Sequence, residues 1–162
     1  MFRQTREITY RHTIEAFMNL FKSLLLSLIT VFVLSACSDT VQDNLNALEA
    51  HDLAKAGKIT LIDIRRPDEW RQTGVGQDVR TINMQHPQGM QGFAQEVAQA
   101  VGQDIHAPIV LICRTGSRTS RLVPVLTEMG FTNVRQVPEG MLGSRHGPGW
   151  IARGLPLESC DC

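Results

Sequence analysis

The 162-residue chain has no excess of charge of either sign, because 16 lysines and arginines balance 16 aspartates and glutamates. Surfaces that bind nucleic acid need a strong positive field, so this balance argues against a nucleic-acid partner. The chain also has no internal repeat, and its few histidines and cysteines show no metal-ligand spacing. We therefore expect one folded domain that carries neither a resident metal nor a cofactor.

The apolar run at residues 23–34 is too short for a membrane-spanning helix, which needs roughly 17–25 residues. A short segment that ends at Lys22 precedes the run with positive charge, and the small residues Ser35 and Ala36 follow it. This order is typical of a bacterial secretory signal. An uncleaved membrane anchor is the alternative, and the length of the run argues against it.

The end of this run, Leu34-Ser35-Ala36-Cys37, resembles the lipobox of bacterial lipoproteins. The resemblance implies that residues 18–36 are a signal peptide and that Cys37 becomes the acylated N-terminus. It also implies a location on the periplasmic side of the cell envelope, with the lipid on Cys37 as the membrane anchor. By the same resemblance Ser38, which directly follows the cysteine and precedes Asp39, favours the outer membrane, because an aspartate directly after the cysteine goes with retention in the inner membrane.

The other segments follow from these boundaries. Residues 1–17 precede a complete signal, so we interpret them as a non-native upstream extension and Met18 as the true start. Residues 37–44 form a polar tether, residues 45–158 the folded domain, and residues 159–162 a tail that contains Cys-Asp-Cys.

Within the domain, strand-like and helix-like patterns alternate. Apolar runs predict short strands at residues 59–64, 81–84, 109–113 and 134–137. Helical spacing of apolar residues predicts helices over 45–57, 93–101 and 118–129, and Pro67 suits the first turn of another helix. The alternation predicts an α/β fold, with a mostly parallel central sheet and helices on both faces. In such folds a ligand lies at the carboxyl ends of the strands.

Two of these helices carry specific expectations. Leu45, Leu48 and Leu53 mark the apolar face of the first, which Gly57 ends. The apolar face of the last consists of Leu122, Val125, Leu126 and Met129. Pro124 lies inside this last helix and should kink it or shorten its first part.

The strand at 109–113 ends on Cys113, and a short basic loop leads from it into the next helix. The N–H groups of that loop, the positive end of the helix, and the side chains of Arg114 and Arg118 all favour a thiolate over a thiol. The alternative is a small apolar residue that completes a buried strand. The loop favours the reactive thiol, because its donors suit an anionic sulfur or an oxyanion.

Three segments together resemble the rhodanese-like sulfurtransferase domain. Residues 61–70 are similar to the family's opening strand and turn, and residues 113–118 are similar to its active-site loop. Residues 139–157 are similar to its closing segment, including the final Gly-Leu-Pro. Three features depart from the family. Glu139 stands where a glycine is usual, residues 143–149 form an added Gly/Pro-rich loop, and residues 81–84 (Thr-Ile-Asn-Met) stand in place of a His-Ile-Pro-Gly-Ala-type segment.

The resemblance implies a rhodanese-type sulfurtransferase whose nucleophile is Cys113. Its thiolate takes a sulfane sulfur from a small anionic donor such as thiosulfate and holds it as a persulfide. Cyanide, a small thiol or a protein cysteine then accepts the sulfur. The implied substrate-binding residues are Arg114, Thr115, Gly116, Ser117, Arg118 and Thr119. Of these, Arg114 or Arg118 is expected to hold the leaving sulfite.

Two other functions stay open for the same loop. Rhodanese-fold phosphatases and arsenate reductases hold a tetrahedral oxyanion in a Cys-x5-Arg loop, whereas four residues separate Cys113 from Arg118. The smaller loop suits a single sulfur atom better than a phosphoryl group, because loop size sets which atom fits under the amides. The third possibility is a non-catalytic binding module, but rhodanese-like modules of that kind commonly lack the cysteine.

Polar residues outside the loop have structural or marginal roles in this interpretation. We expect Asp63 to accept loop amides at the end of its strand and Arg65 to pair with Glu69, so that all three support the structure. His86 and His146 lie in irregular segments that can border the site. A lone histidine in such a segment is usually solvated or hydrogen-bonded, and no ligand spacing supports a metal.

The tail and the tryptophans complete the expectations. Export permits a disulfide between Cys160 and Cys162, although one intervening residue gives a small, easily reduced ring. The tail is then either inert or a mobile segment that accepts sulfur from Cys113 or resolves its oxidation. Trp70 and Trp150 are most simply core aromatics.

Overall fold

The structure is a computed structural model, and it describes Met18 and residues 44–162. The predicted extension, signal peptide, lipidation residue Cys37 and tether therefore lie outside the described residues, apart from Met18 and Asn44. In the described part of the chain, no helix has both the length and the apolar character needed to cross a membrane. The helices and strands from residue 44 onward all fall within residues 47–158.

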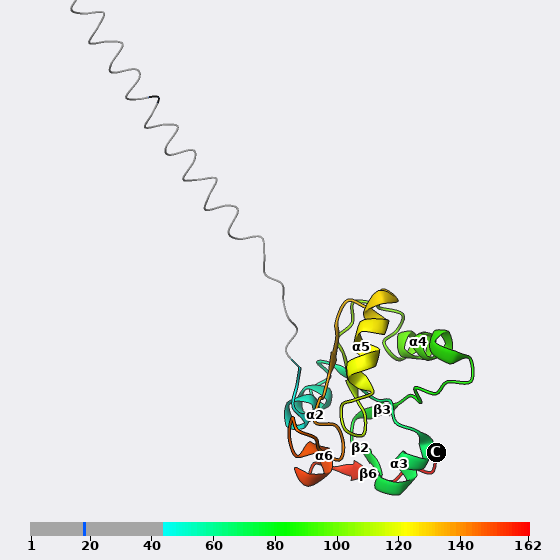
Figure 1. The fold of residues 1–162 in the computed structure, drawn as a ribbon, viewed down its shortest axis with the longest axis vertical. Coiled ribbons are helices and arrows are strands. Elements are labelled where there is room, and N and C mark those ends of the chain that lie inside the picture. Colours follow the sequence, from blue (N-terminus) through cyan, green and yellow to red (C-terminus); the bar gives the residue numbers. More distant parts are fainter. Residues whose placement is uncertain (1–17, 19–43) are drawn as a thin grey trace, which may run out of the picture. The chain divides into compact units, whose positions relative to one another are not determined.

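A four-stranded parallel sheet forms the centre of the domain (Figure 1). Its strands lie in the order β3-β1-β4-β5, and each neighbouring pair is parallel. Their bounds are Thr60–Asp63 for β1, Val79–Thr81 for β3, Ile109–Ile112 for β4 and Val134–Gln136 for β5. A second, antiparallel sheet pairs β2 (Val75–Gly76) with β6 (Leu157–Glu158). The mostly parallel sheet that the sequence predicts is confirmed.

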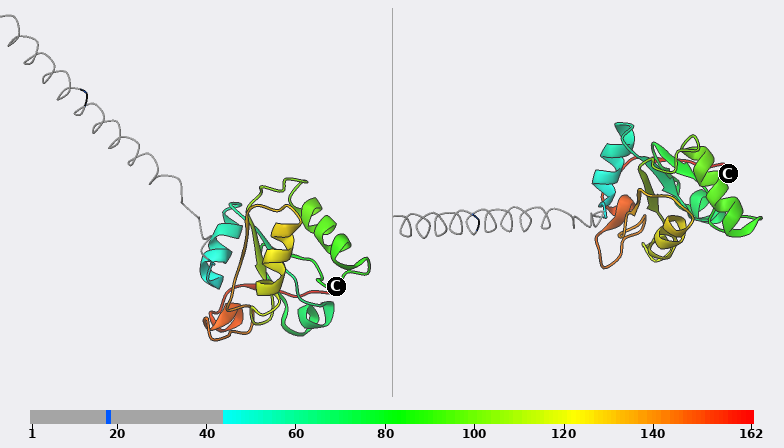
Figure 2. Two further views of the ribbon diagram at one scale, coloured as in Figure 1. Left: turned by 45° about the horizontal axis from the view of Figure 1, so that its top comes forward. Right: turned by 90° about the horizontal axis from the view of Figure 1, so that it is seen from above.

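Helices cover both faces of the parallel sheet (Figure 2). One face packs against α2 (Ala47–Lys55) and α6 (Gly149–Ala152). The other face packs against α4 (Gly89–Ala100) and α5 (Thr119–Glu128). The short helix α3 (Pro67–Thr73) follows β1, with Pro67 in its first turn as predicted. The predicted α/β fold with helices on both faces is therefore confirmed.

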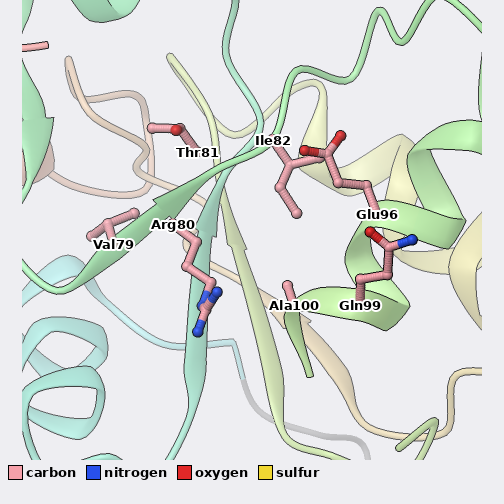
Figure 3. Close-up of a pocket in the computed structure, with 7 residues that line it drawn as sticks. All are labelled: Val79, Arg80, Thr81, Ile82, Glu96, Gln99 and Ala100. Carbon is pink, nitrogen blue, oxygen red and sulfur yellow. The ribbon is translucent and has the colours of Figure 1, made fainter. Parts of the chain in front are cut away.

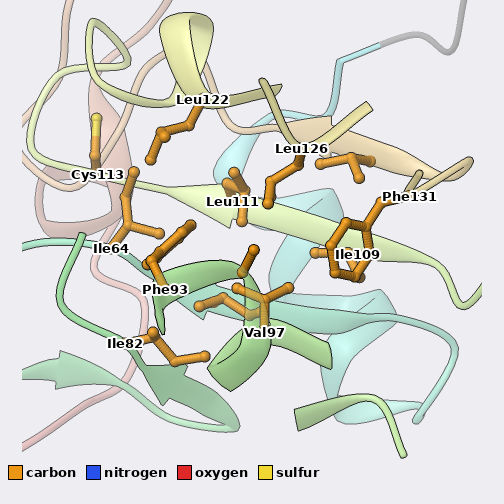
Figure 4. Close-up of a cluster of buried hydrophobic side chains, with 13 residues drawn as sticks. Ile64, Ile82, Phe93, Val97, Ile109, Leu111, Cys113, Leu122, Leu126 and Phe131 are labelled. Atoms are coloured by element: carbon orange, nitrogen blue, oxygen red, sulfur yellow. The ribbon is translucent and has the colours of Figure 1, made fainter. Parts of the chain in front are cut away.

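The central strand β4 divides its side chains between two buried clusters, because successive residues of a strand point to opposite faces. Ile109 and Leu111 join the cluster under α4 and α5 (Figure 4). Val110 and Ile112 join the cluster under α2 and α6, which also holds Trp150. All four strand residues are fully buried, as is typical of an inner parallel strand.

Some local expectations are wrong. The third strand begins at Val79 rather than at Thr81, because residues 79–81 pair in register with all but the first residue of β1. The expected apolar face of the first helix is also wrong in part, since Leu48 is 47% exposed. The small residues Ala47 and Ala50 face the core instead, which lets α2 lie close to the sheet.

The last predicted helix also differs in detail. Leu122 and Leu126 are buried as expected, but Met129 is 39% exposed because it caps the end of α5 beyond the core. Pro124 lies inside α5, and the helix continues beyond it to Glu128. Its position is exposed, so the proline ring meets solvent there. Both tryptophans are buried core residues, as the sequence predicts.

Candidate active site

Cys113 directly follows β4 at the carboxyl edge of the sheet and begins residues 113–118, here called the cysteine loop (Figure 4). Its side chain has no exposed surface and belongs to the core cluster under α4 and α5. The sulfur donates a long hydrogen bond of 3.9 Å to Thr119 Oγ1. Cys113 is the free cysteine of the described residues, because Cys160 and Cys162 form a disulfide.

The segment after β5 holds the base of the cysteine loop. The carbonyl oxygen of Cys113 accepts from the N–H of Met141, and that of Arg114 accepts from the N–H of Leu142, both at 2.9 Å. Gly140 permits this approach, because a Cβ there would lie 2.6 Å from the Arg114 oxygen. Residues 140–142, which lie outside the cysteine loop, therefore fix the backbone at the start of that loop.

Gly116 sets the shape of the rest of the loop. Its φ of +82° lies in the left-handed region, and a side chain there would collide with the carbonyl oxygen of Pro138. The carbonyl oxygen of Gly116 accepts from the N–H of Ser120 at 3.1 Å and from the Thr119 hydroxyl at 2.9 Å. These bonds fold the loop back onto the first turn of α5.

The backbone N–H groups of residues 114–118 donate to no acceptor in the part of the chain that the structure describes. The carbonyl oxygens of Arg114, Gly116 and Arg118, in contrast, all accept hydrogen bonds. Consecutive free N–H groups at the start of a helix make a concave set of donors that binds anions. The cysteine loop can therefore stabilise negative charge next to the sulfur.

Thr119 lies under the loop rather than on its open side. It is fully buried, and its Oγ1 is 2.7 Å from Gln136 Oε1 as well as in contact with the Cys113 sulfur. The sequence predicts a substrate-binding role for Thr119, and the structure places its hydroxyl next to the Cys113 sulfur. Sequence reasoning did not identify Gln136, because a glutamine in a short strand carries no signal of its own.

Arg118 is held by Glu69 of α3 in a two-pronged ion pair. Arg118 Nη1 lies 2.5 Å from Glu69 Oε2, and Nη2 lies 3.0 Å from Oε1. Burial pushes the pKa of Glu69 up, but hydrogen bonds from Arg118 and from the N–H of Arg66 leave this pKa below its ordinary value. The carboxylate raises the pKa of Arg118, and the nearby Cys113 contributes to the same shift. This pair joins the cysteine loop to α3.

Asp63 and Arg65 form a second, fully buried ion pair at the end of β1, with 2.7 Å between Arg65 Nη2 and Asp63 Oδ2. Asp63 also accepts from the N–H of Arg65, as expected of a carboxylate at a strand end. Burial raises the pKa of Asp63, and Arg65 opposes that rise. The predicted Arg65–Glu69 ion pair is wrong, because Asp63 is the buried carboxylate beside Arg65 and Glu69 turns to Arg118.

Arg65 also ties the strand to the end of α3. Its guanidinium donates to Thr73 Oγ1 at 2.7 Å and to the carbonyl oxygen of Gly74 at 2.8 Å. A contact of 3.4 Å with the backbone carbonyl oxygen of Glu69 completes the set. Arg65 therefore supports the position of α3, from which Glu69 reaches the cysteine loop.

Glu139 is a buried carboxylate that sequence reasoning did not assign to any role. It accepts from the N–H groups of Ala47 at 2.6 Å and Gly149 at 2.9 Å, and it pairs with Arg153. The one sequence feature that could have drawn attention to Glu139 is its departure from the family pattern, which has glycine at this position. Through Gly149 it fixes one end of the added segment, residues 143–149.

The two histidines named from the sequence lie in different places. His146 lines a cavity together with residues 115–117 of the cysteine loop. His86 is elsewhere: its Nδ1 accepts from the N–H of Gln88 at 3.1 Å, and its Nε2 lies 3.7 Å from Glu96. Over the described residues, no three His, Cys, Asp or Glu side chains gather in a way that could hold a metal ion.

The tail forms a disulfide between Cys160 and Cys162, and Arg71 of α3 donates to the carbonyl oxygen of Cys162. No contact between these cysteines and Cys113 is present in the described residues. The tail is thus attached to the outer side chains of α3, and its role stays a prediction.

Comparison with known proteins identifies the family to which the chain belongs. Residues 46–144 match the family model of the rhodanese-like domain. Thiosulfate sulfurtransferase 16, a chloroplastic protein of Arabidopsis thaliana, is 28% identical over 126 residues, which cover 74% of this chain and 95% of that protein. An uncharacterized protein of Rickettsia conorii is 27% identical over 118 residues, which cover 71% of this chain and 96% of that protein.

Solved structures share the fold. The polysulfide-sulfur transferase homodimer of Wolinella succinogenes is 26% identical, with a TM-score of 0.53, and the match covers 83% of this chain and 90% of that one. A rhodanese-like domain from Anabaena sp. is 16% identical, with a TM-score of 0.56 and coverage of 74% and 81%. Because the family model spans more than half of the sequence, the chain belongs to the rhodanese-like domain family.

Proposed function

We propose that the chain is a sulfurtransferase in which Cys113 carries a sulfane sulfur as a persulfide. The donor is a small sulfur-containing anion such as thiosulfate, and the acceptor is a thiol or cyanide. The free N–H groups of residues 114–118 carry this proposal, because they can stabilise the charge of a terminal persulfide sulfur. Relatives that include a thiosulfate sulfurtransferase and a polysulfide-sulfur transferase support the same chemistry.

The reaction has two steps. In the first, the Cys113 thiolate attacks the sulfane sulfur of thiosulfate, a new S–S bond forms, and the donor's S–S bond breaks with its electron pair leaving on sulfite. In the second, an acceptor thiolate attacks the outer sulfur of the persulfide and the thiolate of Cys113 returns. No oxidant or reductant is needed, because one sulfur atom moves from one nucleophile to the next.

The size of the cysteine loop favours this reaction over phosphoryl or arsenate chemistry. Four residues separate Cys113 from Arg118, one fewer than in the phosphatase loop. A purely non-catalytic role is disfavoured because the nucleophile is present.

Intact-mass spectrometry after incubation with thiosulfate tests the proposal. We expect the wild-type protein to gain one sulfur atom, and cyanide to remove it as thiocyanate. Cys113→Ser should gain none, whereas a double Cys160→Ser, Cys162→Ser variant should gain sulfur as the wild type does. Failure of the wild type to gain sulfur, together with hydrolysis of an aryl phosphate, would support the phosphatase alternative instead.

We also propose that the protein acts on the periplasmic side of the envelope, held by a lipid on Cys37. The sequence pattern of residues 18–37 supports this location. The same mass measurement on protein extracted from membranes provides the test. A chain that begins at an acylated Cys37 supports the proposal, and an unmodified chain that retains residues 18–36 contradicts it.

A further inference from the structure

A cavity of about 380 Å³ borders the cysteine loop on the side of β5. Residues 115–117 form one wall, and Pro138 with part of the added segment 143–149 forms the other. The residues that line the cavity carry the hydroxyls of Thr115, Ser117 and Ser144, the imidazole of His146 and the guanidinium of Arg145. None of the lining residues is acidic. The volume lies in the range of roughly 300–1,000 Å³ that holds small organic ligands, so it exceeds the need of a single small anion.

The other arginines around the loop are less available to a substrate. Three are already paired with carboxylates: Arg118 with Glu69, Arg65 with Asp63, and Arg66 with Asp68. Arg114 has no side-chain partner among the described residues, but it does not line the cavity. Arg145 lines the cavity and meets no carboxylate in the described part of the chain. It is therefore the cation that an anion in this cavity would meet.

Contacts within the added segment hold Arg145 in place. Arg145 Nε donates to His146 Nε2 at 3.1 Å, and the N–H of His146 donates to the Ser144 hydroxyl at 3.1 Å. That hydroxyl donates in turn to the carbonyl oxygen of Pro138 at 2.9 Å. The Nη groups of Arg145 have no acceptor among the described residues, so they stay available to a ligand while Nε fixes the side chain.

We propose that Arg145 binds the anionic group of the sulfur substrate in this cavity beside the cysteine loop. The inference rests on the proposed sulfur transfer and identifies the side chain that recognises the charge. The group is either the sulfonate end of a thiosulfate-type donor or the carboxylate of a thiol acceptor, and both offer oxygens to the two free Nη groups. The added segment 143–149 thereby supplies a specificity residue from outside the cysteine loop.

Two alkylating reagents that differ in charge test this proposal on Cys113: anionic iodoacetate and neutral iodoacetamide. Both must reach the same buried sulfur, and at reagent concentrations low enough that alkylation is slower than loop opening, the ratio of their rates cancels access and reports the effect of charge. We expect Arg145→Gln to lower the iodoacetate rate roughly fivefold and to leave the iodoacetamide rate within about twofold. Arg145→Lys should keep most of the wild-type ratio because it keeps the charge.

Arg80→Gln is the matched control. Arg80 is an exposed arginine that lines a different cavity between β3 and α4, together with Glu96 and Gln99 (Figure 3). Its removal changes the net charge equally and should leave the rate ratio unchanged. Equal losses of both rates in Arg145→Gln, or the same change of ratio in Arg80→Gln, would overturn the proposal.

Steady-state kinetics then identify the substrate that Arg145 binds. A higher KM for thiosulfate in Arg145→Gln assigns the residue to the donor. A higher KM for mercaptoacetate, without a change for neutral mercaptoethanol, assigns it to the acceptor. An unchanged KM for both anions overturns the proposal. If the wild type transfers no sulfur yet keeps a charge-dependent alkylation ratio, the proposed function fails while the anion site stands.

Discussion

Gly116 is the residue at which the cysteine loop depends on the absence of a side chain. Two independent requirements meet there: a left-handed backbone, and contact with the carbonyl oxygen of Pro138. The first requirement alone costs an L-residue about 1 kcal/mol. The second displaces the backbone of the loop or of the Pro138 segment, and with it the N–H groups next to Cys113.

We therefore predict that Gly116→Ala lowers the rate of persulfide formation by at least about tenfold, because catalytic donors must stay within a fraction of an ångström of their place. Gly102→Ala is the control for backbone strain. Gly102 also has a positive φ, of +66°, but no atom lies within 4 Å of an added Cβ. The control should lose about 1 kcal/mol of unfolding free energy and keep its activity. Similar activities for the two variants in a thiosulfate–cyanide assay would contradict the prediction.

At this scale the sequence predicts residues whose chemistry is local and misses those whose partners are distant. Cys113 and its loop could be identified as a candidate site because the cysteine, the glycine and the start of the helix are adjacent in the chain. The partner of Glu69 could not, since Arg118 lies 49 residues away and only tertiary packing brings the two together. Gln136 and Glu139 could not be assigned from the sequence for the same reason, because Gln136 contacts Thr119 and Glu139 contacts Ala47 only through tertiary packing.

At the scale of elements, α3 acts as a support for the cysteine loop. Arg65 fixes the end of α3 to β1, and Glu69 extends from α3 to Arg118. Glu69 is 6% exposed, so water competes little for its carboxylate. Loss of this carboxylate would leave Arg118 without its partner and free the start of α5.

We predict that Glu69→Gln lowers kcat/KM for thiosulfate by about tenfold and the free energy of unfolding by about 1–2 kcal/mol. The amide keeps the size of the side chain but loses the charge that Arg118 needs. Asp68→Asn is the matched control, because Asp68 also pairs with an arginine but is exposed. Its effect on urea unfolding should stay within about 0.5 kcal/mol. Equal unfolding free energies for the two variants would show that the Glu69–Arg118 pair does not support the loop.

Most elements follow from local patterns, and the exceptions have physical reasons. The strand β4 is a continuous apolar run and β1 lies in a mostly apolar one, so the sequence predicts their burial on both faces. The edge strand β3 has no such run, and pairing with β1 alone sets its bounds. The buried face of α2 differs from the prediction because α2 packs close to the sheet, where alanine fits better than leucine. This distance is a property of the packed structure and cannot be obtained from the helix sequence.

At the scale of the whole molecule, Glu139 joins parts of the domain that are far apart in sequence. Its carboxylate accepts from the first residue of α2 and the first residue of α6, and it pairs with Arg153 beyond α6. Burial pushes the pKa of Glu139 up, but hydrogen bonds from Arg153, Ala47 and Gly149 leave it below the ordinary value of 4.5. The ionised form is therefore the one that the folded state favours.

We predict that Glu139→Gln lowers the free energy of unfolding at pH 7 by about 3 kcal/mol, because an amide NH₂ then faces buried donors. A lowered pKa contributes stability that is complete above the unfolded value near 4.5 and is lost as pH falls through the folded value. The gap between wild type and variant should thus shrink below about pH 4.5 in urea titrations. Exposed Glu128→Gln is the control and should change stability by less than about 0.5 kcal/mol. A gap that does not depend on pH would contradict the assignment.

The complete burial of Cys113 has a kinetic consequence. A sulfur with no exposed surface meets a substrate only while its loop is open. If opening is slower than chemistry, every substrate reacts at one common rate; if opening is faster, the opening equilibrium scales all rates by one factor. For the proposed sulfurtransferase, the closed loop in both cases protects the sulfur between turnovers, so an oxidant competes with substrate only during the open interval.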